Sequence, residues 1–241
     1  MRIKLLISYN GSTFEGLQVQ KHTENTIMGQ LYKALESLNI QTKLHASGRT
    51  DAGVHAFKQM LHCDIPLYWS DLVKLKEHLQ HKLPSSIAIR KLSKTDETFH
   101  ARYSAKRRAY RYILCDKKSN PFESDLVTFT SELNQGLIEE AIKVFEGEHD
   151  FGLFKKSGGA DGSDIRTIFK TRVYNYKDKT ILYFEANGFL RSQIRLMVSF
   201  LLNISEGKLT KEQLLEQLKG LSTHSKRLAP PNGLYLSNII Y

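Results

Sequence analysis

Hydrophobic residues in the first part of the chain recur with two different periods. Between residues 27 and 38 and between 69 and 79 they follow the three-and-four spacing of an amphipathic helix. Asn25 or Thr26 can cap the first helix, and Ser70 the second. Alternating or continuous apolar runs, which are typical of strands, lie outside these helices. The predicted strands cover residues 3–8, 43–46, 57–65 and 87–92.

A comparable order of elements follows in the second part of the chain. The order strand, helix, strand, strand, helix, strand is that of a ferredoxin-like unit, an antiparallel sheet with helices on one face. We therefore predict an α+β protein of two ferredoxin-like halves, with domains over residues 1–100 and 101–241. The second half is predicted to contain strands over 109–115, 168–175, 180–186 and 233–241, helices over 135–145, 189–204 and 211–218, and a glycine-rich loop over 157–162.

Charge adds the first indication of a partner. The chain has a formal net charge of +10 at pH 7, and a positive field of this size attracts polyanions. Cations interleaved with aromatic rings suit phosphates and unstacked bases. A solvated strand with ordinary cross-strand aromatics fits the same pattern, and membrane surfaces and acidic proteins stay open as partners. The segment in question contains Arg102, Tyr103, Lys106, Arg107, Arg108, Tyr110, Arg111 and Tyr112.

Several classes of protein are not indicated. The apolar stretch at the N-terminus is short and is interrupted by Lys4, so we expect neither a signal peptide nor a membrane span. Cys63 and Cys115 lie in separate strand-like runs, which is typical of buried free thiols in a reducing cytoplasm. The chain contains no Walker loop, dinucleotide fingerprint, Cys-x-x-Cys pair or His-Glu-x-x-His helix, so we expect no cofactor and no metal.

One glycine-flanked run stands out as candidate chemistry. In Gly48 to Gly53 the two glycines bracket Arg-Thr-Asp-Ala, so a sharp bend can project Arg49 and Asp51 from a loop between two strands. An aspartate in such a turn is also typical of a residue that hydrogen-bonds its own backbone. The run by itself therefore leaves catalysis and turn formation open for Asp51.

The longer run from Gly48 to Ala56, Gly-Arg-Thr-Asp-Ala-Gly-Val-His-Ala, resembles the signature of the TruA family of tRNA pseudouridine synthases. The resemblance extends over nearly the whole chain, and it implies a catalytic cleft between the two halves. Three positions depart from the family pattern: Asn10 replaces the usual Asp, Leu17 the usual Trp, and Leu196 a common Asn. The other matching segments are Tyr9-Asn10-Gly11-Ser12, Gly16 to Gln20, Leu83-Pro84 with Ile87, Phe99-His100-Ala101-Arg102, Tyr110-Arg111-Tyr112, His149-Asp150-Phe151, Phe189-Leu190 with Arg195, and Ala229-Pro230 with Gly233 to Leu236.

The resemblance implies that Asp51 is the nucleophile. Pseudouridine formation breaks the bond from ribose C1′ to N1, turns the uracil and rejoins it through C5. A carboxylate can attack C1′, add to C6 or promote a glycal by removing a proton, and the sequence leaves these three routes open. The isomerisation changes no oxidation state and needs no activated donor, in agreement with the missing cofactor motifs.

Other site residues follow from the same resemblance. Asp51 must stay charged when the base closes the site, which requires a nearby cation, and Arg195 on the predicted helix 189–204 is the candidate. Tyr110 is expected to pack on the target uracil and Arg49 to help extrude it, since an enzyme cannot reach a stacked base in place. From the helical spacing alone, Arg191 is expected on the same side of the helix as Arg195, at i, i+4, either as an ordinary surface charge or as a phosphate contact. The expected substrate contacts are Arg49, Arg107, Arg108, Tyr110 and Arg191.

These observations favour a cytoplasmic RNA isomerase that acts on the anticodon stem-loop of tRNAs, near positions 38–40. The family resemblance implies a homodimer. A non-catalytic RNA-binding protein or RNA chaperone on the same fold is the competing hypothesis, because the basic and aromatic segment would suffice for it. An RNA nuclease or methyltransferase lacks its expected motifs in this chain.

Overall fold

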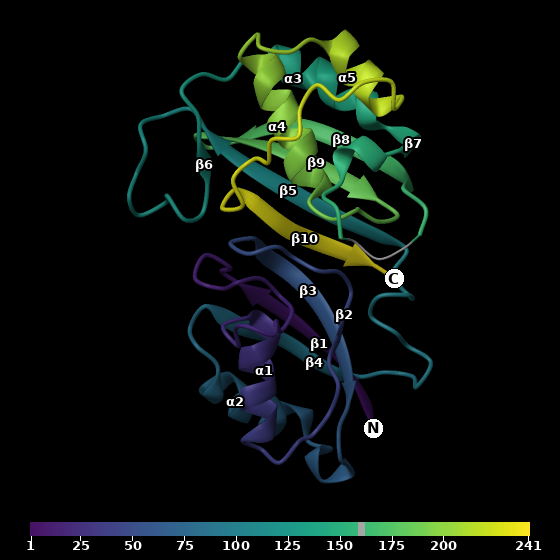
Figure 1. Cartoon of the computed structure of the whole chain (residues 1–241). Helices are drawn as coiled ribbons and strands as arrows, with labels where there is room; N and C mark the ends of the chain where they lie inside the picture. Colours follow the sequence, from purple (N-terminus) through teal and green to yellow (C-terminus); the bar gives the residue numbers. More distant parts are fainter. Residues whose placement is uncertain (159–161) are drawn as a thin grey trace. The chain divides into compact units, whose positions relative to one another are not determined.

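The structure is a computed structural model that describes residues 1–158 and 162–241, and it divides into two compact units (Figure 1). Unit 1 comprises Met1–Lys106 and Tyr235–Tyr241, and unit 2 comprises Arg107–Leu234. Part of the predicted glycine-rich loop, residues 159–161, lies outside the described residues. The predicted α+β class is confirmed, and each unit contains mostly antiparallel strands with accompanying helices.

Unit 1 is built on the strand order β4-β1-β3, with β2 and β10 both paired to β3. Strand β1 runs antiparallel to both β3 and β4. Figure 1 shows α1 and α2 on the same face of these strands. The elements are β1 (Arg2–Tyr9), α1 (Ile27–Glu36), β2 (His45–Ala46), β3 (His55–Asp64), the short 3-10 helix η1 (Leu67–Trp69), α2 (Leu72–Lys82), β4 (Ile87–Lys94) and β10 (Leu234–Ile240).

The core of unit 1 follows from the predicted periods. Every second side chain of β1 is buried, and the buried side chains of α1 and α2 recur at helical spacing. Thr26 caps α1 by accepting a hydrogen bond from the Gly29 amide. The predicted cap of α2 is wrong: Asp71, rather than Ser70, accepts from the Val73 and Lys74 amides, so the helix begins at Leu72.

The last strand of the chain belongs to unit 1. Strand β10 pairs in parallel with β3, in the register Tyr235↔His55 and Leu236↔Ala56. The Tyr235 ring stacks on both His55, at 4.5 Å between ring centroids, and Phe57, at 4.7 Å. The predicted domain range 101–241 included this strand, whereas the structure groups Tyr235–Tyr241 with Met1–Lys106 in unit 1.

Unit 2 has the antiparallel strand order β5-β9-β8-β7, and β6 pairs in parallel with β5. Figure 1 shows α3, α4 and α5 gathered on one face of its strands. Buried phenylalanines fill the space between sheet and helices, among them Phe145, Phe154 and Phe200. The elements are β5 (Arg107–Cys115), β6 (Thr128–Phe129), α3 (Gln135–Ile142), η2 (Lys143–Phe145), β7 (Gly147–Asp150), η3 (Gly152–Phe154), β8 (Ile165–Tyr176), β9 (Lys179–Ala186), α4 (Gln193–Ser205) and α5 (Lys211–Leu218).

Helix α4 begins four residues later than predicted. Ser192 has a left-handed backbone with φ 58, which a continuous right-handed helix excludes. The buried Gln193 side chain accepts a hydrogen bond from the Leu190 amide at 2.8 Å and holds the incoming chain. Arg191 therefore lies before the helix, and the prediction that it shares a helical face with Arg195 is wrong.

The two cysteines agree with their predicted state. Cys63 and Cys115 are both buried and carry free thiols. Burial raises the pKa of the Cys63 thiol to about 12, which keeps it protonated and unreactive. In the part of the chain that the structure describes, no helix is both long and apolar enough to cross a membrane.

Candidate active site

The loop that carries Asp51 is held by the N-terminal segment of unit 1. The Leu17 amide donates to the Thr50 carbonyl at 3.2 Å, and the Gly53 amide donates to the Phe14 carbonyl at 3.3 Å. The Tyr9 hydroxyl shares a buried hydrogen bond of 2.7 Å with Thr50 Oγ1. Two segments that match the family motifs are thus bonded to each other, with Asp51 between the bonded positions.

Two glycines of the N-terminal segment allow this close contact. A Cβ on Gly11 would lie 2.0 Å from the Val54 carbonyl oxygen, and one on Gly16 would lie 3.0 Å from the Thr50 carbonyl oxygen. Gly16 also has φ +99, a conformation that L side chains rarely adopt. The Gly11 amide donates to His55 Nδ1 at 3.0 Å. Glycine at these two positions lets the backbone approach the Asp51 loop closely.

A buried glutamine fixes the entry to the loop. Gln59 is fully buried on β3; its Oε1 accepts from the Ser47 hydroxyl at 2.7 Å, and its Nε2 donates to the Gly48 carbonyl at 2.9 Å. At the other end Gly53 has φ +76 and supplies the predicted bend. Sequence reasoning missed Gln59, because a single polar residue in an apolar strand carries no periodic signal.

The two predicted site residues of unit 1 differ in exposure. Asp51 is half-buried, and its carbonyl accepts from the Val54 amide at 3.2 Å across the bend. Arg49 is exposed two residues earlier on the same loop. The structure therefore presents both side chains from one loop, as predicted from the run of residues 48–53.

Tyr110 of unit 2 lies on β5, opposite Phe184 of β9. Its ring is buried and meets the Phe189 ring edge to face, with the centroids 5.3 Å apart and the planes at 86°. Phe189 belongs to the segment that leads into α4. The contact joins two segments that match the family motifs, and it fixes the side of β5 on which Tyr110 stands.

Arg195 lies in the first turn of α4 and is half-buried. Its Nε donates to the Ala229 carbonyl at 2.7 Å, and the Ala229 amide donates to the Arg195 carbonyl at 3.0 Å. This reciprocal pair connects α4 to the segment before β10. The direction of the guanidinium is thus set by a residue 34 positions later in the chain.

That later segment is itself anchored by a buried tyrosine. The Tyr112 hydroxyl donates to the Pro230 carbonyl at 2.8 Å and also lies 2.8 Å from Thr128 Oγ1. Thr128 Oγ1 donates to Asn232 Oδ1 at 3.1 Å. A Cβ on Gly233 would lie 2.6 Å from Thr128 Oγ1, so glycine is needed there as well. Tyr112 therefore supports Arg195 through the Ala229-Pro230 segment.

Arg107 and Arg108, at the start of β5, have identified partners. Arg107 forms an ion pair of 2.9 Å with Glu185, and its guanidinium lies 4.4 Å from the centre of the Phe169 ring. The hydrogen bond from Tyr183, together with Arg107, holds the pKa of the Glu185 carboxyl below its usual value. Arg108 donates to the Asn187 carbonyl at 2.9 Å.

Arg191 is exposed and contacts a different loop. Its guanidinium donates to the Ser157 carbonyl at 2.9 Å and to the Gly158 carbonyl at 3.3 Å. The Arg191 carbonyl accepts from the Lys156 amide at 3.0 Å. The side chain thus ties the approach to α4 to the segment at 155–158.

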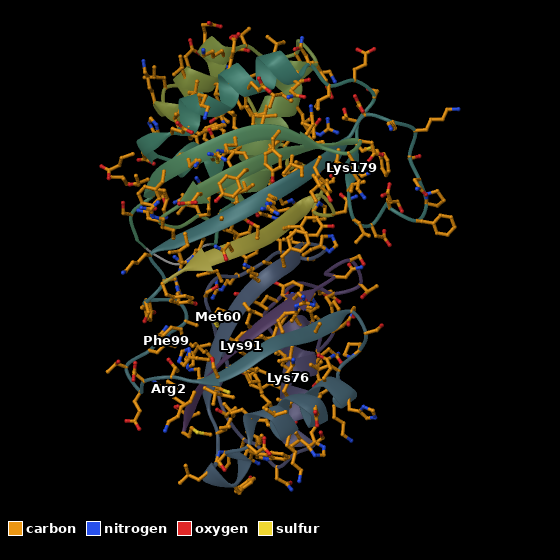
Figure 2. The ribbon with its side chains drawn as sticks, turned by 180° about the vertical axis from the view of Figure 1, so that it is seen from behind. Arg2, Met60, Lys76, Lys91, Phe99 and Lys179 are labelled. Atoms are coloured by element: carbon orange, nitrogen blue, oxygen red, sulfur yellow. The ribbon has the colours of Figure 1, made fainter. Side chains whose placement is uncertain are left out.

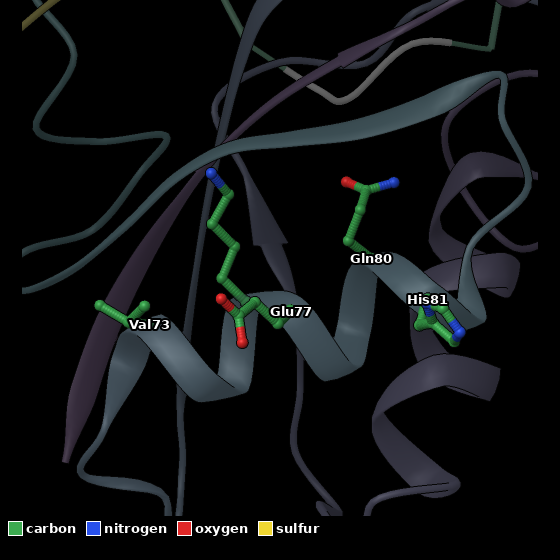
Figure 3. Close-up of a pocket in the computed structure, with 5 residues that line it drawn as sticks. Val73, Glu77, Gln80 and His81 are labelled. Atoms are coloured by element: carbon green, nitrogen blue, oxygen red, sulfur yellow. The ribbon is translucent and has the colours of Figure 1, made fainter.

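None of the candidate site residues lines the surface hollow along α2. A hollow of 410 Å³ lies along α2 (Figure 3), where Gln80 bonds to the backbone of Ile87 and Ile89 and Lys76 to that of Arg90. These polar groups hold α2 to β4. Over residues 1–158 and 162–241, no group of three or more His, Cys, Asp or Glu side chains is arranged to hold a metal ion.

The site residues fall into two sets. Asp51 and Arg49 share one loop of unit 1, whereas Tyr110, Arg195 and the other arginines lie in unit 2. Within each unit, motif segments that are far apart in the sequence are bonded together. In unit 1 the Asp51 carboxylate lies on a loop held by hydrogen bonds at both ends. In unit 2 the Tyr110 ring and the Arg195 guanidinium are held by contacts with Phe189 and Ala229.

Comparison with known proteins relates the chain to one enzyme family. A family model described as tRNA pseudouridine synthase matches residues 5–104 and 141–241. Asp51 and Arg195 lie inside the matched stretches, and Tyr110 lies between them.

Relatives of similar length carry the name tRNA pseudouridine synthase A. The protein of Wolinella succinogenes is 40% identical over 235 residues, which cover 98% of this chain and 92% of that protein. The protein of Campylobacter jejuni subsp. jejuni serotype O:6 is 39% identical over 241 residues and 100% of both chains. The protein of Helicobacter hepaticus is 36% identical over 99% of this chain and 98% of that protein.

One solved structure is similar at a lower level. A chain in a crystal structure of a Cbf5-Nop10-Gar1 complex aligns with 98% of this chain and 48% of its own length, at 10% identity and a TM-score of 0.40. A likeness of this extent carries no conclusion.

Proposed function

Because the chain belongs to the tRNA pseudouridine synthase family, a family of isomerases, we propose that it converts uridine to pseudouridine at positions 38–40 of the tRNA anticodon stem-loop. The observation that carries the proposal is the clamped loop around Asp51. Tyr9, Leu17 and the glycines of the N-terminal segment all bond to or contact this loop. Such support pre-organises one carboxylate for reaction.

Asp51 is the proposed nucleophile. A carboxylate on a loop fixed at both ends keeps its position when a uridine enters, so little freedom is lost at the reacting centre. The reaction breaks the C1′–N1 bond and forms a C1′–C5 bond in the same nucleotide. Attack at C1′, addition to C6 and the glycal route all use the same carboxylate and remain three forms of the proposal.

Arg195 is proposed to keep the Asp51 carboxylate ionised. Burial by substrate disfavours charge, and a guanidinium offsets that penalty because it is always protonated. The bond from Arg195 Nε to Ala229 supports this role, since it limits the directions that the side chain can take. Tyr110 is proposed to pack on the target uracil, and its contact with Phe189 supports a fixed ring position.

The remaining site residues are proposed to bind RNA. Arg49 is exposed on the Asp51 loop, a position suited to extruding the target base and filling its space. Arg107, Arg108 and Arg191 are proposed to add positive charge along the path of the tRNA backbone. The Arg107 ion pair and the carbonyl contacts of Arg108 and Arg191 limit the positions of these guanidinium groups.

The proposal also covers the substrate, the cellular location and the oligomeric state of the enzyme. The reaction needs neither a redox cofactor nor an activated donor, so tRNA is the one substrate. We expect the protein to work in the cytoplasm, where tRNA is processed, as a homodimer. Sedimentation at micromolar concentration tests the homodimer.

Release of tritium from tRNA labelled at uracil C5 tests the function. The wild-type protein is expected to release tritium, and Asp51→Asn is expected to release none while it binds tRNA as tightly as wild type. If wild-type protein releases no tritium although both proteins bind tRNA equally, the chain is an RNA-binding protein without this activity.

A further inference from the structure

The segment from Glu97 to Ser104 of unit 1 is firmly anchored, although it lies outside helices and strands. Arg2 donates from its guanidinium to the carbonyls of Glu97 and Phe99. Figure 2 shows Arg2 and Phe99 beside each other. The amide of the fully buried Ala101 donates to His62 Nδ1 at 3.1 Å, and the Ala101 carbonyl accepts from the Tyr241 hydroxyl at 2.9 Å. These bonds fix the segment to β1, β3 and the C-terminus.

Within the segment His100 organises a tight turn. Its Nδ1 accepts from the Arg102 amide at 3.2 Å and from the Tyr103 amide at 3.3 Å. The His100 amide donates to the Ser104 hydroxyl, and the Ser104 amide donates back to the His100 carbonyl. Burial lowers the pKa of His100, which favours the neutral ring that can accept these bonds at neutral pH.

The turn displays Tyr103 to solvent. The ring is 75% exposed, although it is a large aromatic on a fixed backbone. His100 supports it with the ring centroids 4.4 Å apart, and the Arg102 guanidinium stands 5.5 Å from its centre. An exposed aromatic ring that is already ordered loses little conformational entropy when a flat partner stacks on it.

The charge around Tyr103 favours a polyanionic partner. Within unit 1, the stretch from Thr98 to Lys106 contains no Asp or Glu and contains Arg102 and Lys106. A protein-binding hot spot would also use an exposed tyrosine, but the Arg102 guanidinium at the ring and the net charge of +10 favour nucleic acid over most protein partners.

We propose that Tyr103 is a stacking site for an unpaired base of the tRNA substrate, outside the target uridine, with Arg102 beside it at the adjacent phosphate. The inference rests on the proposed function, and it adds a subsite to it. Stacking of a base on an aromatic side chain is sequence-tolerant, because every base presents a π-face. The subsite would therefore serve different tRNAs equally.

The affinity of the protein for unmodified tRNA tests the subsite. Tyr103→Ala is expected to weaken binding about 10-fold, in the range for loss of one stacked base, and Tyr103→Phe to stay within 2-fold of wild type. Because the lost contact is not ionic, the slope of affinity against salt concentration should stay unchanged. Tyr176→Ala is the matched control, since Tyr176 is 61% exposed and has Lys177 Nζ 5.8 Å from its ring centre.

Three results would overturn the inference. Tyr103→Ala could bind tRNA as tightly as wild type, Tyr103→Phe could bind as weakly as Tyr103→Ala, or Tyr176→Ala could lose as much affinity as Tyr103→Ala. Sedimentation of Tyr103→Ala identifies a fourth contradicting result. A shift to smaller species with unchanged tRNA affinity would show that the ring contacts a second copy of the chain instead of a base. Tritium release by wild type is measured in parallel, so that failure of the proposed function is seen independently of Tyr103.

Discussion

Gly11 lies against the backbone of the Asp51 loop at a distance that only a residue without a side chain allows. A Cβ there would lie 2.0 Å from the Val54 carbonyl oxygen, a backbone atom that cannot move aside alone. Gly11→Ala is therefore expected to lower the free energy of unfolding by about 2 kcal/mol or more and to reduce turnover. Urea denaturation and tritium release measure the two effects.

Gly136→Ala is the matched control for that substitution. Gly136 lies in α3, where a Cβ would meet only the Asn134 side chain at 3.6 Å, an ordinary contact distance. Alanine is also the better helix former, so this variant should be as stable as wild type or slightly more stable. Unchanged stability of Gly11→Ala would contradict the account of the clamped loop.

Arg195→Ala separates a role in turnover from a role in binding. If Arg195 keeps Asp51 ionised, turnover should fall by about 100-fold while tRNA affinity changes less than 3-fold. Arg195→Lys keeps the charge but cannot reproduce the guanidinium geometry, so it should recover part of the loss. Single-turnover rates measure the effect of each variant on turnover, and tRNA binding measures its effect on affinity. Equal losses in rate and affinity would instead identify Arg195 as a phosphate contact.

The residues that the sequence identified are those carried by a motif, and those that it missed act through long-range contacts. Asp51 and Arg195 were predicted from their motifs and stay proposals as catalytic groups. The supports from Gln59, Tyr112 and Ala229 were not predicted, because each depends on which loop meets which strand in three dimensions. A one-dimensional pattern gives burial and period but not these partners.

Elements with clear periodicity were predicted well, and elements without it were not. The strand β7 (Gly147–Asp150) was missed, because its sequence Gly-Glu-His-Asp is polar and it pairs on one side with β8. The start of α4 was misplaced, because Phe189 and Leu190 continue the apolar period while Ser192 turns left-handed. Periodicity reports the buried face and not the backbone dihedral angles.

A cluster of histidines joins β2, β3 and the segment before β5, and its pKa shifts make unit 1 sensitive to pH. The rings of His45, His62 and His100 lie within 4.7 to 5.1 Å of one another. Burial, followed by the neighbouring His100, His45 and Arg2, lowers the pKa of His62 to about 4. An unfolded histidine has a pKa near 6.5, so the unfolded chain binds more protons between pH 6.5 and 4.

The stability of the protein is therefore expected to fall as the pH falls from about 6.5 to about 4. The contribution of His62 is fully present above pH 6.5 and amounts to at most about 3.5 kcal/mol, since one pKa unit corresponds to about 1.4 kcal/mol. Urea denaturation across this range should show a smaller pH dependence for His62→Gln than for wild type. The exposed His81→Gln is the control and should follow wild type. Identical pH profiles for all three proteins would contradict the assignment.

At the scale of the whole molecule, the sequence correctly indicated the class and the family. The α+β architecture follows from the order of periodic segments, and the family resemblance is confirmed by relatives that match over the full chain. The return of the last strand to unit 1 was not predictable, because parallel pairing with β3 joins residues about 180 positions apart in the chain. The net charge of +10, read from the sequence alone, favours a polyanionic partner such as tRNA.

The most direct test of the central claim is chemical mapping of pseudouridine in unmodified tRNA after incubation with the purified protein. Carbodiimide treatment followed by primer extension marks each pseudouridine by position. Wild-type protein is predicted to give new stops at positions 38–40, and Asp51→Asn is predicted to give none at equal tRNA occupancy. Stops at these positions with Asp51→Asn at the wild-type rate, or no pseudouridine in any tRNA with wild type, would contradict the account.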